Sequence, residues 1–261
     1  NHIGVPLTIL KINQSHEFAI VEMGMNHAGE IKALCDIALP NAGIITNIGT
    51  AHIEFMGSIE AIFKEKSTLF YEVKKNAPDT GLFVLNGEDK FLDQLSWEDH
   101  LIKFNGSHSG INVKVEKNKI VISSSEQKYI LENDHLIGEH NFYNLAVCFL
   151  LALNLKPECA SQFQESAKSF KPRGNRSMLI ERHNKKIFMD AYNANFDSML
   201  VSITGYLKFL LEKGLNSNDA LFVLGDMNEL GTYSEEYHSK IGAFVQKMGI
   251  KNIIFVGRFC A

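Results

Sequence analysis

Short apolar runs alternate with amphipathic stretches in the first part of the chain. The runs at residues 18–21, 42–48 and 81–86 have the length and composition of buried strands, and the stretches at 30–39 and 58–75 have helical spacing. A strand–helix–strand order gives parallel strands joined by a crossover. We therefore expect these strands to end at one edge of a mostly parallel sheet.

The hydrophobic period changes to two between residues 113 and 131, which predicts a small antiparallel meander. Two helices are expected next, at residues 141–153 and 157–169. A charged segment with Pro and Gly at residues 171–176 is typical of a linker. The α/β rhythm then returns, with strands expected at residues 186–190, 220–226 and 253–256 and helices at 198–211 and 235–248.

These patterns predict an α/β fold in two domains. The first, residues 1–171, has a mostly parallel central sheet with the meander appended, and the second, residues 172–261, is a Rossmann-like α/β unit. A length of 261 residues agrees with two domains of about 100–200 residues each. Strand-like segments near both limits, and a first residue other than Met, favour a fragment of a longer polypeptide.

Composition narrows the class of protein. The chain is 45% hydrophobic and 21% charged, as in ordinary globular proteins, and its net charge of −4 argues against a nucleic-acid-binding surface. No apolar run reaches the roughly 18 residues of a membrane span. Four scattered cysteines without CxxC spacing predict reduced thiols and a cytoplasmic location: Cys35, Cys148, Cys159 and Cys260.

Residue types that bind metal follow the first two predicted strands. Glu22, Asn26 and His27 come after the first strand, and Asn47 and His52 follow the second. Ligands bind at the carboxyl edge of open α/β sheets, so a carboxylate and an imidazole there suggest a divalent metal and phosphate chemistry. Each residue also has an ordinary interpretation, because loop asparagines serve turns and a single histidine is more often structural than a ligand.

Lys66 lies in the middle of the apolar stripe of the helix predicted from Ser58. A lysine there can extend its amine from the edge of the buried face to solvent. A desolvated lysine instead tends to lose its charge, and a neutral amine can add CO₂ to become an anionic carbamate ligand. With Glu22 and His52 expected at the same edge, we favour the functional interpretation.

Amide side chains open the helix predicted at residues 141–153. Asn141 and Asn144 follow Gly138-Glu139-His140. Asparagine is a good helix cap, but a carboxamide also donates and accepts together at an adenine edge. The residues alone leave capping and base reading equally open.

Polar residues also follow two strands of the second domain, and arginines lie in the linker. Two such loops in one small domain favour a second ligand-binding surface, and the alternative is that their polar residues form turns and helix caps. An arginine in the linker could bind a phosphate through its guanidinium group. The candidates are Asp190, Tyr192, Asn193, Asn195, Asp226, Glu229, Arg173 and Arg176.

Two phosphate-binding motifs are missing from the sequence. No Gly-Lys pair occurs, so there is no Walker A loop, and no GxGxxG occurs, which argues against a dinucleotide dehydrogenase. The motifs that are present, residues 190–195 (DAYNAN) paired with residues 224–231 (LGDMNELG), then Ser234 and His238, resemble those of the Mur ligases. Mur ligases are the ATP-dependent amide-forming enzymes of peptidoglycan synthesis, and the resemblance runs along essentially the whole chain.

The resemblance implies an ATPase-type central sheet and a set of roles. Glu22 and His52 would hold Mg²⁺, and Lys66 would be a carbamylated lysine near a second Mg²⁺. The remaining roles it implies are ATP binding by Asn141, Asn144, Arg176, Arg173 and Asp190, and substrate binding by Asn26, His27, Tyr192, Asn193, Asn195, Asp226 and Glu229.

Within the family, the paired motifs most resemble members that join D-alanyl-D-alanine to UDP-N-acetylmuramoyl-tripeptide through an acyl phosphate. Ala191 and Phe196 stand where Ser and Pro are expected, and the arginine segment is irregular, so the register of Arg173 and Arg176 stays open. Because the P-loop and the uridine-nucleotide domain are missing, we expect this polypeptide alone to be inactive. Another Mur-type ligase, a folylpolyglutamate-type ligase and a non-catalytic nucleotide-binding module are the alternatives.

Overall fold

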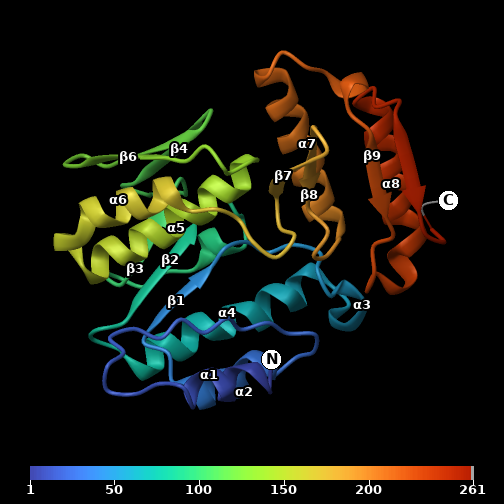
Figure 1. The fold of residues 1–261 in the computed structure, drawn as a ribbon. Coiled ribbons are helices and arrows are strands. Elements are labelled where there is room, and N and C mark those ends of the chain that lie inside the picture. Colours follow the sequence, from blue (N-terminus) through green and yellow to red (C-terminus); the bar gives the residue numbers. More distant parts are fainter. Residues whose placement is uncertain (260–261) are drawn as a thin grey trace. The chain divides into compact units, whose positions relative to one another are not determined.

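The structure is a computed structural model that describes residues 1–259, so the predictions for Cys260 and Ala261 lie outside the described residues. Its contacts group the chain into two compact units, Asn1–Ile111 and Asn112–Ala261, which Figure 1 shows with their helices and strands labelled. This grouping does not test the domain boundary predicted after residue 171, which stays a prediction.

The first unit is built on a parallel sheet of three strands in the order β1-β2-β3. Ala42 lies opposite Leu82 and Ile45 opposite Leu85, so β1 and β2 end together. The strands of this sheet are β1 (Ala42–Ile45), β2 (Leu82–Asn86) and β3 (Leu101–Phe104). The sequence analysis predicted β1 and β2 but not β3.

Two helices of the first unit lie where the sequence analysis predicted them, and the second is the crossover between the parallel strands β1 and β2. They are α2 (Glu30–Ala38) and α4 (Ile59–Asn76), and α4 contacts α2, β1 and β2. Ser58 is the N-cap of α4, since its hydroxyl accepts the amide hydrogen of Ala61 at 3.1 Å. Phe70 on α4 packs edge-on against Phe83 of β2 and Trp97, in a fully apolar core.

The strand predicted at residues 18–21 is wrong. The structure has no strand there, and the side chains of Phe18 and Ile20 are 50% and 93% exposed. A strand forms only where a neighbouring strand takes up its backbone hydrogen bonds. The three-stranded sheet of the first unit does not include this segment, so its apolar composition does not make it a strand.

The second unit begins with the predicted antiparallel meander. Its strands are β4 (Asn112–Glu116), β5 (Lys119–Ser123) and β6 (Lys128–Glu132), in the order β4-β5-β6. Val113, Ile120, Ile122 and Leu131 are buried, as the alternation predicted. The expected helices α5 (Glu139–Leu155) and α6 (Ala160–Ser169) pack against the meander and each other.

The rest of the second unit contains a β-hairpin and a pair of parallel strands. One helix precedes the parallel pair and another connects its two strands. The strand predicted at 186–190 pairs antiparallel with β7, which the sequence analysis missed, and the described residues show no ladder between it and β9. The parallel pair of β9 and β10 is confirmed. The elements are β7 (Met178–Arg182), β8 (Lys185–Met189), α7 (Phe196–Glu212), β9 (Phe222–Gly225), α8 (Ser234–Lys247) and β10 (Ile253–Val256).

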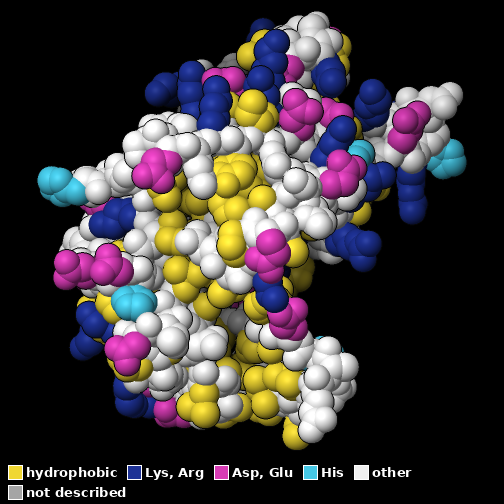
Figure 2. Space-filling model, turned by 90° about the vertical axis from the view of Figure 1, so that its left-hand side faces the viewer, with side chains coloured by type: hydrophobic (Ala, Val, Ile, Leu, Met, Phe, Trp, Pro, Cys, Tyr) yellow, Lys and Arg dark blue, Asp and Glu magenta, His cyan; other side chains and the backbone are white. Residues whose placement is uncertain are grey.

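Short helical turns complete the chain. They are α1 (Gly4–Ile9), α3 (Ile53–Met56), η1 (Leu92–Gln94), η2 (Pro157–Cys159), η3 (Ser217–Asp219) and η4 (Gly231–Tyr233). Among residues 1–259, none of the helices combines the length and apolarity that crossing a bilayer requires. Figure 2 shows apolar side chains gathered in patches on one face, with charged groups scattered around them.

Glu65 on α4 is buried and holds the start of α2. Its carboxylate accepts the amide hydrogens of Gly29 and Ile31, both at 2.8 Å. Gly29 is the left-handed N-cap of α2 and has no side chain to do this. A negative charge also suits the positive end of the helix dipole.

We predict that Glu65→Ala lowers the free energy of unfolding by about 2–4 kcal/mol, because it leaves two amide groups near the helix start unsatisfied. Glu60→Ala is the matched control, since Glu60 is an exposed glutamate in the first turn of the same helix. Urea denaturation of both variants measures the difference. Equal losses for the two would contradict the capping role of Glu65.

Candidate functional site

Lys66 reaches the carboxyl end of β1. Its amine donates a hydrogen bond to the carbonyl oxygen of Asn47 at 3.1 Å, and the residue is partly buried. The next residue, Ile48, donates its amide hydrogen to the Asp89 carboxylate at 2.7 Å, which ties the loop after β1 to the loop after β2. Lys66 therefore lies at the sheet edge where the sequence analysis expected a ligand.

His52 begins α3 five residues beyond Asn47. It adopts a left-handed backbone conformation, with φ of 65°, which sets it off from the helix that follows. The ring of His27 lies 5.1 Å, centroid to centroid, from the ring of Phe55 in α3. The loop after residue 22 and the loop after β1 therefore meet at α3.

Glu30 organises the loop that carries Asn26 and His27. Its carboxylate accepts the amide hydrogen of Asn26 at 2.7 Å and that of His27 at 3.2 Å. These two hydrogen bonds, the bond from Asn26 first, hold the pKa of Glu30 below its usual value. The backbone of Asn26 and His27 is thus committed to loop structure, while both side chains face outward and are exposed.

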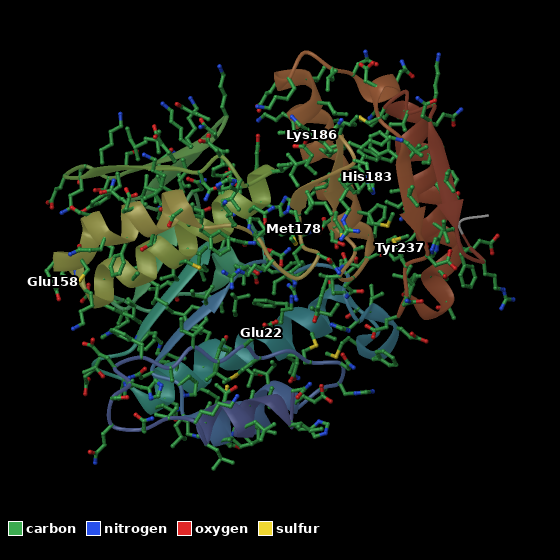
Figure 3. The ribbon with its side chains drawn as sticks, viewed as in Figure 1. Glu22, Glu158, Met178, His183, Lys186 and Tyr237 are labelled. Carbon is green, nitrogen blue, oxygen red and sulfur yellow. The ribbon has the colours of Figure 1, made fainter. Side chains whose placement is uncertain are left out.

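Glu22 is exposed and precedes this loop (Figure 3). Within residues 1–259, no three His, Cys, Asp or Glu side chains are grouped so that they could hold a metal ion. The metal-binding roles expected for Glu22, His52 and Lys66 stay predictions. A carbamate on Lys66 would supply oxygen atoms, which are the ligands that Mg²⁺ prefers.

Asp89 is a site residue that the sequence analysis missed. Besides Ile48, it accepts the amide hydrogens of Phe91 and Leu92 at 2.9 and 3.1 Å. It follows β2 by three residues, so the rule that selected Glu22 and His52, polar residues just after a strand, would have found it. Its contacts give it the role of fixing the loop between Asn47 and His52.

In the second unit, the start of α5 is fastened to α7. Gly138 and Gly205 approach so closely that a Cβ added to Gly205 would lie 2.7 Å from the Cα of Gly138. Lys208 of α7 also bonds Glu139 at 2.7 Å. These contacts hold Asn141, the candidate base-reading residue, next to α7.

Asn141 uses part of its carboxamide within the protein. Its Nδ2 donates to the carbonyl oxygen of Ile137 at 2.7 Å. A carboxamide has a second N–H and an acceptor oxygen, which is the pair that an adenine edge needs. Asn144 lies one turn further along α5 and is exposed. Before them, burial lowers the pKa of His140, and the negative charge of Asp190 acts in the opposite direction.

Several of the predicted phosphate and ribose residues meet at the carboxyl end of β8. The guanidinium of Arg176 stacks on the ring of Tyr192, 3.8 Å from its centroid. The amide hydrogen of Ser177 bonds the Asp190 carboxylate at 2.9 Å, so the linker runs along the end of this strand. Arg173 is exposed and lies beyond the tight turn at residues 174–177.

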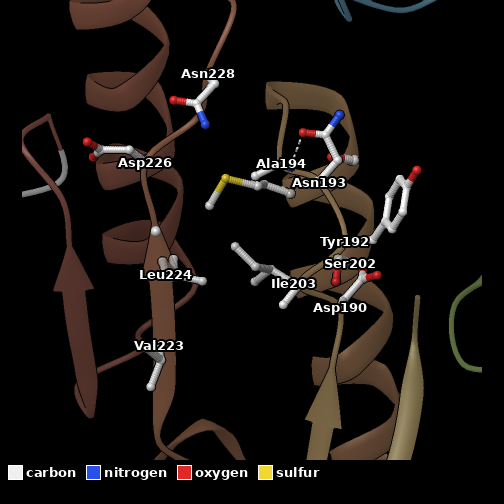
Figure 4. A pocket seen from close by; sticks show the side chains of 14 residues that line it. Asp190, Tyr192, Asn193, Ala194, Ser202, Ile203, Val223, Leu224, Asp226 and Asn228 are labelled. Atoms are coloured by element: carbon white, nitrogen blue, oxygen red, sulfur yellow. Dashed lines mark hydrogen bonds between the residues drawn. The ribbon is translucent and has the colours of Figure 1, made fainter. Parts of the chain in front are cut away.

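A cavity of about 350 Å³ opens between the carboxyl ends of β8 and β9 (Figure 4). Ligand pockets in proteins commonly begin near this size. Its two charged lining residues, Asp190 and Asp226, are both acidic, and the rest of the lining is polar or apolar. The lining comprises residues 190–194, Ser198, Met199, Ser202, Ile203, residues 223–226 and Asn228.

Some predicted binding residues of the second unit are used in loop structure. Asn195 is the N-cap of α7, where its side chain and that of Ser198 bond each other's amide groups. The Asp226 carboxylate accepts the amide hydrogens of Arg258 and Phe259 at 2.7 and 3.1 Å. Asn193 accepts from Ala194. These contacts do not test their roles in binding, which stay predictions.

Glu229 also belongs to the loop after β9. It adopts a left-handed backbone conformation with φ of 59° and is partly buried. Met227 and Leu230 on either side of it are each 2% exposed and anchor the loop. The loop therefore has a defined shape beside the cavity, into whose lining it contributes Asp226 and Asn228.

We predict opposite effects from two glycine substitutions in helices. Gly205→Ala places a methyl group against the Gly138 backbone and should lower the free energy of unfolding by about 1–3 kcal/mol. In the matched variant Gly242→Ala on α8, the new Cβ meets nothing within 4 Å, and stability should rise by about 0.5–1 kcal/mol. Denaturation curves test both. A stabilising Gly205→Ala would contradict the close contact of α5 with α7.

Comparison with known proteins agrees with these features. Residues 1–152 match the Mur ligase middle domain. The chain is 30% identical over 263 residues to the UDP-N-acetylmuramoyl-tripeptide–D-alanyl-D-alanine ligase of Haemophilus influenzae, covering 98% of the chain and 55% of that protein. The ligase of the same name from Bacillus subtilis is 30% identical over 269 residues, covering 100% of the chain and 56% of that protein.

Solved structures show the same fold. MurF from Acinetobacter baumannii superposes with a TM-score of 0.80 at 23% identity, over 99% of this chain and 56% of that one. MurF from Thermotoga maritima, in complex with ADP, gives 0.75 at 22% identity, over 97% of this chain and 61% of that one.

The chain belongs to the Mur ligases, a family of ATP-dependent amide-forming enzymes. It spans about half the length of the relatives it matches.

Proposed function

We propose that the chain is the ATP- and metal-binding part, together with the acceptor-side domain, of a ligase that joins D-alanyl-D-alanine to UDP-N-acetylmuramoyl-tripeptide. The proposal includes the domain division into residues 1–171 and 172–261, with an ATPase-type sheet in the first domain and a Rossmann-like second domain. It also includes a cytoplasmic location, where the nucleotide-linked precursor and ATP are available.

The observation that carries the proposal is the placement of the Lys66 amine at the carboxyl end of β1, 3.1 Å from the Asn47 carbonyl oxygen. Lys66 lies among the apolar positions of α4, and its amine extends to this strand end. The Lys66 amine lies next to the loop that carries His52, at the sheet edge where phosphates bind in α/β proteins. A group there could bind a metal ion or a phosphate.

Glu22, His52 and a carbamylated Lys66 are the residues that would hold Mg²⁺. The bound ions would offset negative charge on the ATP phosphates and on the incoming carboxylate. Hydrogen bonds from Lys66 to Asn47 and from Ile48 to Asp89 join α4 and the loop after β2 to the loop after β1 at this edge. In the second unit, Asn141 and Asn144 would face the adenine. Arg176 and Arg173 would reach the phosphates, and Asp190 would lie at the ribose region.

The cavity between β8 and β9 is the proposed place of the acceptor dipeptide. Of its two acidic lining residues, Asp190 is assigned to the ribose region, and Asp226 suits an acceptor that carries an amine. The cavity would be shaped further by Tyr192, Asn193, Asn195 and Glu229. Asn26 and His27 would bind the tripeptide substrate. The tripeptide carboxylate would attack the γ-phosphate of ATP and release ADP, and the acceptor amine would then attack the acyl phosphate, lose a proton and release phosphate.

We predict that Lys66→Ala lowers ligation by at least about 100-fold, as expected when a group that stabilises transition-state charge is removed. The measurement is phosphate release that depends on D-alanyl-D-alanine, in the full-length gene product that contains this sequence. Lys64→Ala is the matched control, because Lys64 is an exposed lysine on the same helix. Added bicarbonate should not restore Lys66→Ala.

Full activity of Lys66→Ala would show that the carbamate role is wrong. Phosphate release that requires glutamate in place of D-alanyl-D-alanine would favour the folylpolyglutamate-type alternative. ATP binding without phosphate release under any acceptor would favour a non-catalytic module.

A further inference from the structure

His238 is a buried histidine that none of the proposed steps uses. It lies in the second turn of α8, and its side chain is 4% exposed. Phe259 stacks against the imidazole at 5.4 Å between ring centroids. A buried polar ring needs partners for both nitrogens, so its contacts define what it does.

The two nitrogens of His238 have fixed roles. Nε2 accepts the amide hydrogen of Met227 at 2.9 Å, and Nδ1 lies 2.7 Å from the carbonyl oxygen of Ser234. A backbone amide only donates and a carbonyl only accepts, so the proton must be on Nδ1 and the lone pair on Nε2. This tautomer satisfies both backbone partners, and an oxygen of the Asp226 carboxylate lies 3.8 Å from Nε2.

The amide group that His238 accepts belongs to the loop at the cavity. Met227 is 2% exposed, and its neighbours Asp226 and Asn228 both line the cavity between β8 and β9. The buried amide group of Met227 needs an acceptor, and the His238 ring supplies it from α8. Without this hydrogen bond, the Met227 amide would lack an acceptor, and we expect the loop to change conformation at Asp226 and Asn228.

We propose that His238 is a positioning residue for the acceptor end of the site. Its Nε2 fixes the loop of residues 226–229 in the conformation that shapes the cavity. This inference rests on the proposed function, because it assumes that the acceptor dipeptide occupies this cavity. His238 itself does not touch the acceptor, so its effect appears in acceptor binding and not in nucleotide binding.

Two amide substitutions separate the hydrogen bond from the histidine itself. The side-chain oxygen of His238→Gln reaches the position of Nε2 and can accept from Met227, whereas the shorter His238→Asn reaches only the position of Nδ1. In the full-length gene product, His238→Asn should raise the KM for D-alanyl-D-alanine about tenfold, the effect of losing one buried hydrogen bond. The KM for ATP should not change, and His238→Gln should be close to wild type for both substrates.

Hydrogen exchange of the same variants reports on the loop without any activity. The Met227 amide should exchange faster in His238→Asn than in His238→Gln. Val245→Ala is the control for general weakening of α8, because Val245 is 4% exposed on the same helix and outside the cavity lining. It should leave the KM for D-alanyl-D-alanine unchanged.

Faster Met227 exchange with an unchanged acceptor KM in His238→Asn would overturn the positioning role and leave the proposed function intact. An acceptor KM that rises as much in Val245→Ala as in His238→Asn would also overturn it, since the effect would then follow stability alone. A wild-type protein without D-alanyl-D-alanine-dependent ligation would reject the proposed function instead, whatever the exchange rates show.

Discussion

The structure of the first unit depends on one constraint: neighbouring parallel strands have their carboxyl ends at the same edge of the sheet. Because β1 and β2 run in the same direction and in register, their following loops leave the sheet at one edge. The amine of Lys66 on α4 reaches that edge and bonds the Asn47 carbonyl, and Asp89 bonds the amide of Ile48. One sheet edge thus receives a lysine and the loop that carries His52, and the proposed chemistry follows from this placement.

In both units, side-chain carboxylates hold loops in place by accepting backbone amide hydrogens. Glu65 caps the start of α2, Glu30 holds the loop at Asn26, Asp89 holds the loop after β1, and Asp226 holds the segment after β10. Each accepts amide hydrogens that no helix or strand ladder uses. A carboxylate that follows a strand, such as Asp89 or Asp226, can hold the backbone as well as bind a metal, and sequence alone does not separate the two uses.

Elements whose signals are local were predicted well. Ser58 caps α4 as expected, the period-two alternation gave the meander, and α7 and α8 lie where helical spacing placed them. Strand pairing is not local, and there the prediction failed. Residues 18–21 have the composition of a strand but lie outside the sheet, and β8 pairs with β7, a strand that the sequence analysis did not predict. The hairpin had a readable signal, since His183 and Asn184 form a two-residue turn with positive φ at both positions.

The site followed the same division. The strand-end rule drew attention to Asn47, which follows β1 and whose carbonyl oxygen the Lys66 amine bonds, while the role of His52 stays a prediction. The contact of Gly138 with Gly205 and the bond from Met227 to His238 join distant segments and had no signature in the sequence.

The most direct test of the account is the position of Mn²⁺, used in place of Mg²⁺, in crystals of the full-length gene product grown with a non-hydrolysable ATP analogue and bicarbonate. The account predicts an anomalous peak within coordination distance of Glu22 and His52, and density for a carbamate on Lys66. Manganese bound away from the carboxyl edge of β1, with Lys66 unmodified and still bonded to Asn47, would contradict it.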